Sequence, residues 1–192
     1  MAVNLLKGQK ISLNKGNPNL KNIDVTLGWR LDSRTGEPLP DLDVSVFLLT
    51  ATGKVGGPKD FVFYGNLMHP SGAVVLSNNT SRNYNDYNVR VKVDLGIIPA
   101  SIMRVAFTVT IYEAELRKQS FAQVNDAFIR ISEEQSNNEI LRYNITDRFS
   151  AESAVVFGEI YRNNDEWKFN AMGNGYTGSL AALCGNYGVE VG

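Results

Sequence analysis

Apolar and polar residues alternate along several segments of the chain, which is the period expected for β-strands. The clearest segment is residues 88–95 (NVRVKVDL), where valine and leucine fall on one face and charged residues on the other. Residues 23–29 (IDVTLGW) alternate in the same way. Further runs rich in β-branched and aromatic residues are 43–50, 60–65, 104–112, 126–132, 154–163 and 166–173. The pattern predicts a chain made mainly of strands.

Short polar segments separate the predicted strands. Residues 51–58 (ATGKVGGP), 77–86 (SNNTSRNYND) and 134–139 (EQSNNE) are rich in glycine, asparagine and serine, which favour turns. Many strands joined by short polar turns are typical of an antiparallel sandwich or barrel. Because no linker, repeat or low-complexity segment interrupts the sequence, we expect one domain over residues 1–192.

Two segments have the character of short helices. Residues 112–119 (YEAELRKQ) combine helix-forming residues with an early Glu and a late Lys, which suits the helix dipole. Residues 176–188 (YTGSLAALCGNYG) predict a second helix that ends near Gly185 or Gly188.

Composition excludes several kinds of partner. The chain has 192 residues and a formal net charge of −1, so charge gives no reason to expect binding to nucleic acid or to an anionic membrane. The first residues (MAVNLLKGQK) lack the apolar core of a signal peptide, and no apolar run approaches the roughly 20 residues of a membrane span. The single cysteine excludes an internal disulfide. These features favour a cytoplasmic protein without a membrane span.

The sequence offers little for catalysis. His69 is the one histidine and lies in a turn (NLMHPSG), so we expect it to face water rather than act as a general base. Cys184 is expected to be a buried core residue. No nucleophile elbow, P-loop or HExxH motif is present, and GNGYTG (residues 173–178) follows no βαβ pattern. We therefore expect a protein that is not an enzyme.

Acidic and amide side chains gather at two places. Asp41 and Asp43 are two residues apart at the start of a predicted strand, so their carboxylates should share one face and repel each other. Residues 77–88 form a loop of oxygen-bearing side chains that includes Asp86. Calcium takes six to eight oxygen ligands of this kind. On composition alone, solvated polar loops are favoured over a calcium site, since the loop carries little charge.

Five segments in order resemble the TerD family of tellurium-resistance and general-stress proteins. Residues 5–29 are similar to the start of that family, and residues 41–55 (DLDVSVFLLTATGKV) are similar to its Asp-Phe-Asp-Leu-Asp-Ala-Ser motif. Residues 60–74 match its aromatic hairpin. Residues 109–131 and 158–183 match its two longest signatures. The resemblance covers essentially the whole chain.

The resemblance implies an all-β fold, a sandwich of two antiparallel sheets with one or two short helices. It also implies calcium binding in loops at one end of the sandwich. It implies a cytoplasmic stress-response scaffold that acts against tellurite and other toxic agents with other Ter-family proteins as partners, some of them at the inner membrane. No catalytic residues carry over.

The departures from the family pattern fall on its acidic positions. Arg30 follows Trp29 where the family usually has Asp, and Leu39 replaces the first Asp of the aspartate-rich motif. The family's Gly-Asp-Asn turn aligns on residues 77–79, and its later Gly-Asp-Asp-Glu run aligns on residues 86–89. The metal ligands that the resemblance leaves are Asp41, Asp43, Asn79 and Asp86.

Calcium affinity depends steeply on ligand charge, so we expect calcium to bind weakly or not at all. The four ligands are expected to converge near Arg30, which would pair with Asp41 or Asp43 in place of a metal. In the calcium-competent alternative, Asp32 substitutes from a shifted position, with Asn79 and main-chain carbonyls completing the shell.

Three functions remain open from the sequence. The first is a calcium-binding stress protein with weakened affinity. The second is a metal-independent paralogue that acts as a scaffold or assembly subunit through protein contacts. The third is an enzyme with an unrecognised site, which the lone histidine and cysteine disfavour.

Alternate residues of a strand lie on the same face, and this rule also predicts the core. We expect seven side chains to be buried between the two sheets: Trp29, Phe47, Val91, Val93, Phe107, Val109 and Phe128. In residues 166–169, Trp167 and Phe169 should share a buried face, with Glu166 and Lys168 on the other.

Overall fold

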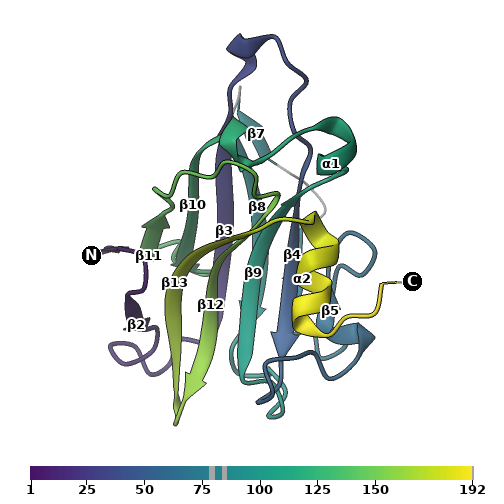
Figure 1. The fold of residues 1–192 in the computed structure, drawn as a ribbon. Coiled ribbons are helices and arrows are strands. Elements are labelled where there is room, and N and C mark those ends of the chain that lie inside the picture. The colour runs from purple at the N-terminus through teal and green to yellow at the C-terminus, as the bar shows by residue number, and fades with distance from the viewer. Residues whose placement is uncertain (78–80, 84–85, 192) are drawn as a thin grey trace.

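The computed structural model describes residues 1–77, 81–83 and 86–191 and contains two sheets packed face to face (Figure 1). The strands of the first, sheet A, lie in the order β1 (Val3–Leu5), β11 (Glu139–Asn144), β10 (Val124–Glu133), β3 (Asn22–Leu31), β8 (Asp86–Asp94) and β6 (Val74–Leu76), with β7 (Ser81–Asn83) also beside β8. The strands of the second, sheet B, lie in the order β2 (Lys10–Ser12), β13 (Glu166–Tyr176), β12 (Ala154–Asn163), β9 (Arg104–Ile111), β4 (Leu42–Leu49) and β5 (Phe61–Val62).

Neighbouring strands run antiparallel with one exception among the described pairs. β1 pairs parallel with β11, so that Val3 lies beside Leu141. The central pairs have regular registers, such as Leu27 opposite Val89. The expected fold class, an all-β sandwich of antiparallel sheets, is confirmed, with one parallel edge strand as an addition.

Alternating apolar residues build the core between the sheets. On β3, Ile23, Val25 and Leu27 are fully buried, and on β8 Val91 is fully buried while Arg90 is exposed. The expected core residues that are buried in this main cluster are Trp29, Val91, Val93, Phe107 and Val109. Period-two alternation therefore located the inner face of these strands correctly.

Two expected core residues lie elsewhere. Phe47 is fully buried but belongs to a second apolar cluster with Leu183 and Tyr187, on the outer face of sheet B. Phe128 is half-buried and lies on the outer face of sheet A beside Gly28. The prediction that both pack between the sheets is wrong. In each strand the residues that face the other sheet occupy the neighbouring positions, so the side chains of Phe47 and Phe128 point outward.

The expected pairing of faces near residue 167 is confirmed. Trp167 and Phe169 are buried in the main core, and Glu166 and Lys168 are half-buried. The guanidinium of Arg162 lies 4.3 Å from the centroid of the Trp167 ring, so the indole is covered from the solvent side.

Both expected helices are present. α1 (Ala114–Arg117) is shorter than the sequence suggested, while α2 (Ser179–Tyr187) ends at Gly188, which has a positive φ of 77°. The described residues also contain three single turns of 3-10 helix: η1 (Ser33–Thr35), η2 (Pro58–Asp60) and η3 (Phe121–Gln123). Among the described residues, no helix is long and apolar enough to cross a membrane.

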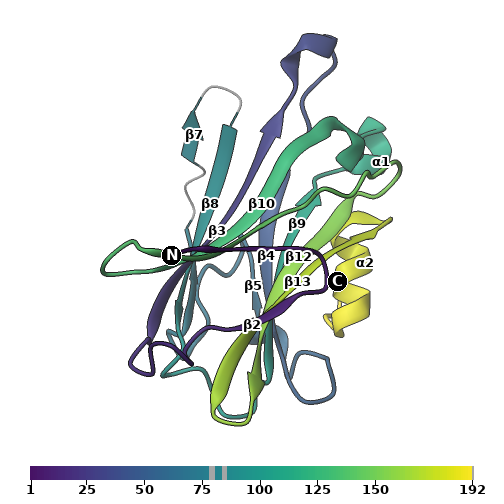
Figure 2. The same ribbon diagram turned by 90° about the vertical axis from the view of Figure 1, so that its left-hand side faces the viewer.

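α2 lies on the outer face of sheet B, whereas no described helix covers the outer face of sheet A (Figure 2). The two sheets are joined at one edge by the segment from β1 to β2, which passes from sheet A to sheet B. At the other edge, the segment after β5 leads from sheet B into β6 of sheet A.

Candidate functional site

Asp41 and Asp43 lie at the start of β4, at the end of the sandwich where β3 also ends. Asp41 is exposed and Asp43 is half-buried. Burial raises the pKa of the Asp43 carboxyl, and the negative charge of Asp41 raises it further. The two carboxylates therefore interact unfavourably, as the sequence predicts for residues two apart on a strand.

Arg30 occupies a different part of this end of the sandwich. It lies directly opposite Asp86 in the β3–β8 pair, and its Nε donates to Asp86 Oδ1 at 2.8 Å. Its Nη1 lies 3.0 Å from Asp126 Oδ2, and the hydrogen bond to Asp86 raises the pKa of Arg30. The expected pairing of Arg30 with Asp41 or Asp43 is therefore wrong, because its carboxylate partners come from neighbouring strands of sheet A.

Asp126 is a partner that the sequence reasoning missed. The register of β10 against β3 shifts between Asn125 and Phe128, and Asp126 adopts a positive φ of 50°. This irregularity brings its carboxylate to Arg30. The Asn-Asp dipeptide was an available signal, because these residues tolerate left-handed backbone better than others.

The Asp32 carboxylate makes contacts within its own turn of the chain. It accepts a hydrogen bond from the backbone N–H of Arg34 at 2.9 Å and pairs with the Arg34 guanidinium at 2.9 Å. These contacts lower the pKa of Asp32 to about 2. The structure therefore gives Asp32 the role of capping η1.

Among the described residues, the expected ligands Asp41, Asp43 and Asp86 do not form one carboxylate cluster. Asp86 lies on sheet A and is neutralised by Arg30, whereas Asp41 and Asp43 lie on sheet B. Within the described ranges, no three His, Cys, Asp or Glu side chains lie close enough together to hold a metal ion. Asn79, the fourth expected ligand, lies outside the described residues. The carboxylates of the described residues alone provide fewer oxygen ligands than calcium usually coordinates.

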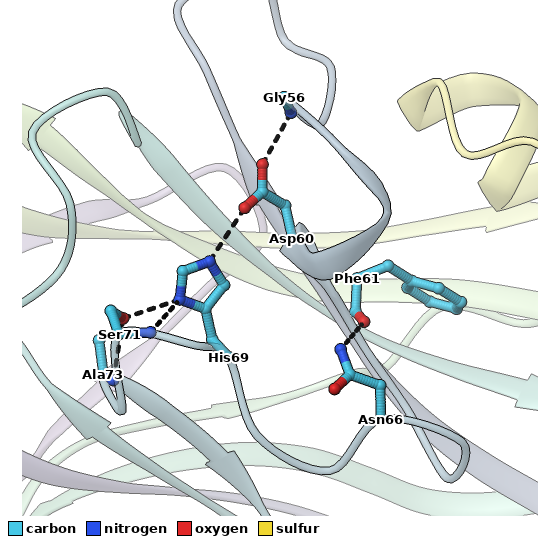
Figure 3. Close-up of polar contacts among 7 residues, drawn as sticks. All are labelled: Gly56, Asp60, Phe61, Asn66, His69, Ser71 and Ala73. Atoms are coloured by element: carbon cyan, nitrogen blue, oxygen red, sulfur yellow. Dashed lines mark hydrogen bonds and ion pairs between the residues drawn. The ribbon is translucent and has the colours of Figure 1, made fainter.

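His69 is not the solvent-facing residue that the sequence suggested. Its side chain is only 7% exposed, and Figure 3 shows its ring between Asp60 and Ser71. Nε2 lies 2.9 Å from Asp60 Oδ1, and Nδ1 lies 2.7 Å from Ser71 Oγ. Asp60 Oδ2 also accepts a hydrogen bond from the N–H of Gly56 at 2.8 Å. The expectation failed because a turn can fold back onto another segment of the chain.

This Asp-His-Ser arrangement, the His69 clasp (Asp60, His69 and Ser71), is built as a structural link. The N–H of Ser71 donates to His69 Nδ1 at 3.1 Å, so in the neutral ring the proton is on Nε2 and points at Asp60. Ser71 Oγ itself accepts from the N–H of Ala73 at 3.1 Å. The clasp ties η2, which leads into sheet B, to the turn that leads into sheet A.

Cys184 is a buried residue of α2, as expected. It packs in the apolar cluster with Leu183 and Tyr187 beneath the helix, and burial raises the pKa of its thiol. A thiol with a raised pKa is a weaker nucleophile at neutral pH, which agrees with a packing role.

Comparison with known proteins defines the class of this chain. The TerD domain matches residues 1–187, so the chain belongs to the TerD domain family. General stress protein 16U of Bacillus subtilis (strain 168) is 46% identical over 100% of both chains. Tellurium resistance protein TerD of Serratia marcescens is 44% identical over 99% of both chains.

A solved structure shares the fold. A homologue of telluride resistance protein (TerD), SCO6318 from Streptomyces coelicolor A3(2), superposes with a TM-score of 0.64 at 21% identity. The similarity covers 86% of this chain and 95% of that one. At this identity the likeness supports the sandwich fold alone.

Proposed function

We propose that this chain is a non-enzymatic stress-response protein of the cytoplasm, which protects the cell against tellurium compounds and other toxic agents as a scaffold for other Ter-family proteins. The observation that carries the proposal is similarity over the full length to proteins named for general stress and tellurium resistance. The structural role of the His69 clasp supports a non-catalytic protein.

We further infer that the chain works with calcium bound weakly or not at all. The guanidinium of Arg30, between Asp86 and Asp126, already supplies positive charge at this end of sheet A. A cation approaching Asp86 would be repelled by Arg30, and the remaining pair on sheet B offers few ligands for calcium. The same arrangement supports the second candidate function, a metal-independent scaffold that acts through protein contacts.

A genetic experiment tests the stress-response function. A strain that lacks this gene should become more sensitive to tellurite, and the wild-type chain should restore resistance. Ser71→Ala serves as a test of catalysis, because a hydrolytic role for the clasp would require the Ser71 hydroxyl. Full complementation by a stable Ser71→Ala chain is expected, whereas its failure would favour an enzyme. Unchanged sensitivity of the deletion strain would contradict the proposed function itself.

Calcium titration tests the inference about the metal. Isothermal titration and melting curves of the wild-type chain should show weak calcium binding or none, and sub-micromolar binding would contradict the inference. Arg30→Asp combined with Leu39→Asp should raise calcium affinity by restoring two carboxylates of the family pattern. Arg117→Asp with Leu116→Asp adds the same charge on α1, where both side chains are exposed, and should leave calcium binding unchanged.

Affinity capture tests the scaffold. The tagged chain, expressed at its native level, should recover other Ter-family proteins from stressed cells. If the metal-independent form of the proposal holds, their recovery will be the same with calcium and with a chelator. Loss of these partners in chelator would favour the calcium-binding form instead.

A further inference from the structure

The outer face of sheet A holds a groove with a volume of about 640 Å³. This face is the one that no described helix covers (Figure 2). The groove is lined by Thr26, Val75, Ser77, Asn88, Val89, Arg90, Lys92, Phe128 and Arg130. Three of these side chains are basic, and none is acidic.

The basic side chains come from one cross-strand row. Arg142 on β11 lies opposite Arg130 on β10, which lies opposite Thr26 on β3, which lies opposite Arg90 on β8. Lys92 follows two residues after Arg90 on the same face of β8. The row therefore presents arginines on both sides of the Thr26 hydroxyl, with a lysine beside them.

Two arginines of this row, Arg90 and Arg130, have few close acceptors among the described residues, whereas Arg142 Nε donates to Asn144 Oδ1 at 2.9 Å. The nearest carboxylate to Arg90 is Asp24, at 3.7 Å, and the nearest to Arg130 is Glu139, at 3.9 Å. Both distances exceed a hydrogen bond. In addition, Arg130 Nε is shielded from solvent and has no hydrogen-bond partner among the described residues. Of the basic side chains that line the groove, only Lys92 has a close ion pair with a described residue, at 2.7 Å from Glu134.

The floor and one wall of the groove are formed by side chains of the strands of sheet A. Thr26 is only 7% exposed, because the long side chains of the neighbouring strands cover it. The ring of Phe128 lies over Gly28, where an added Cβ would come within 2.3 Å of it. The Arg142 guanidinium packs 3.8 Å from the centroid of that ring. The basic row is therefore attached to a rigid sheet rather than to loops.

We propose that this groove binds a small organic molecule that carries a phosphate or similar oxyanion group. Guanidinium groups donate two parallel hydrogen bonds to oxyanions, and the ion pairs of Arg90 and Arg130 with described carboxylates are longer than a hydrogen bond. The volume is in the range of pockets for organic ligands and exceeds what a bare ion needs. The side chains of Val75 and Phe128 supply apolar surface for the rest of the ligand. This site goes beyond the proposed function and does not depend on it.

Isothermal titration in a phosphate-free buffer of low ionic strength tests the site. The probes are adenosine 5′-monophosphate, glycerol 3-phosphate and inorganic phosphate, with adenosine and glycerol as parents that lack the charged group. Each ester should bind at least about tenfold more tightly than its parent, since hydrogen bonds to charged groups contribute this much. Inorganic phosphate should bind more weakly than the esters, and added salt should weaken all three.

Variants assign the binding to the groove. Arg130→Gln and Arg90→Gln should each weaken ester binding by about tenfold or more. Arg130→Lys keeps the charge but loses the planar fork, so its affinity should lie between that of Arg130→Gln and the wild type. Arg117→Gln is the matched control, because the Arg117 side chain is exposed to a similar extent as that of Arg130 but lies on α1, away from sheet A. Melting curves confirm that each variant is folded before it is titrated.

Three outcomes would overturn the proposal. The first is that no phosphate compound binds at millimolar concentration. The second is that binding survives in the folded Arg130→Gln and Arg90→Gln variants. The third is equal affinity for inorganic phosphate and the esters. This result would overturn the proposal of an organic ligand and show that the groove recognises a free oxyanion.

Discussion

The outer faces of the two sheets differ although their inner faces share one core. On sheet B, the outward side chains of Phe47, Ala106 and Val156 are apolar and are buried beneath α2. On sheet A, the outward positions carry Arg90 and Arg130 and stay open to solvent. The sandwich thus needs a covering helix on one side only. The uncovered side is where polar chemistry is available for binding.

The largest expected effect comes from the covered face. Phe47→Ala should lower the free energy of unfolding by about 3–5 kcal/mol, because Phe47 is fully buried and its ring lies 4.7 Å from the rings of both Phe61 and Tyr187. Phe128→Ala on the open face should cost about 1 kcal/mol, since that ring is half-buried. Urea denaturation of both variants measures the difference. Equal losses would break the contrast between the two faces.

The His69 clasp joins the two sheets, and breaking it should have the next largest effect. His69→Ala leaves Asp60 without its 2.9 Å partner in a largely buried setting, and should cost about 2–3 kcal/mol of unfolding free energy. Ser71→Ala removes one neutral hydrogen bond and should cost about 1 kcal/mol. Both are measured by chemical denaturation at neutral pH. A His69→Ala chain as stable as the wild type would show that the clasp does not hold the sheets together.

Two glycines sharpen the comparison by probing close contacts in each sheet. At Gly158 on β12, an added Cβ would lie 2.4 Å from the Phe169 ring and 2.9 Å from the backbone oxygen of Asn170. Gly158→Ala should therefore cost about 2–3 kcal/mol. At Gly28 the three nearest atoms to an added Cβ belong to the side chains of Phe128 and Asn88 on the open face, which can move outward, so Gly28→Ala should cost about 1 kcal/mol. Thermal melts of the two variants test this order, and the reverse order would contradict it.

The smallest effects concern the carboxylates, and they differ in sign. Because the folded pKa of Asp43 is raised above its ordinary 3.8, ionisation opposes folding, and this penalty is absent below that pH and complete above the raised pKa. Asp43→Asn should therefore stabilise the chain slightly at pH 7, with a gain that disappears as the pH falls toward 3.8. Denaturation midpoints across this range measure it.

Asp32 provides the matched control of opposite sign. Its pKa is lowered to about 2, so its ionised form favours folding above the ordinary value of 3.8, and this contribution is lost as the pH falls toward 2. Asp32→Asn should destabilise the chain at neutral pH and have no effect at the acid end. If Asp43→Asn also destabilises the chain at neutral pH, the Asp43 carboxylate has a favourable partner in solution.

The fold was predictable from the sequence because inward residues repeat with period two. The run at residues 88–95 has one clearly apolar face, which fixes the orientation of β8. The run in β4 is apolar on both faces, so parity alone cannot say that Val46 faces the other sheet while Phe47 faces α2. A strand that is apolar on both faces signals a second covering layer, which the apolar residues of α2 provide.

The charged end of the sandwich was less predictable. The interaction between Asp41 and Asp43 follows from their spacing within one strand. The partners of Arg30 do not, because Asp86 depends on the register of β3 with β8 and Asp126 on a local irregularity of β10. The groove of sheet A was also missed. Its two arginines, Arg90 and Arg130, come from different strands, and only the order of strands in the sheet places them in one row.

The pairing of the first two strands has a consequence for how the chain folds as it is synthesised. β1 pairs with β11 and β2 pairs with β13, so Val3 meets Leu141 and Ile11 meets Phe169. Strands β1 and β2 must therefore wait for partners that leave the ribosome much later than they do. Such distant pairings close slowly, and strand edges stay open to other chains meanwhile. A growing chain of this protein cannot complete either sheet until β11 and β13 emerge, which makes the late phase of translation its period of greatest exposure to aggregation.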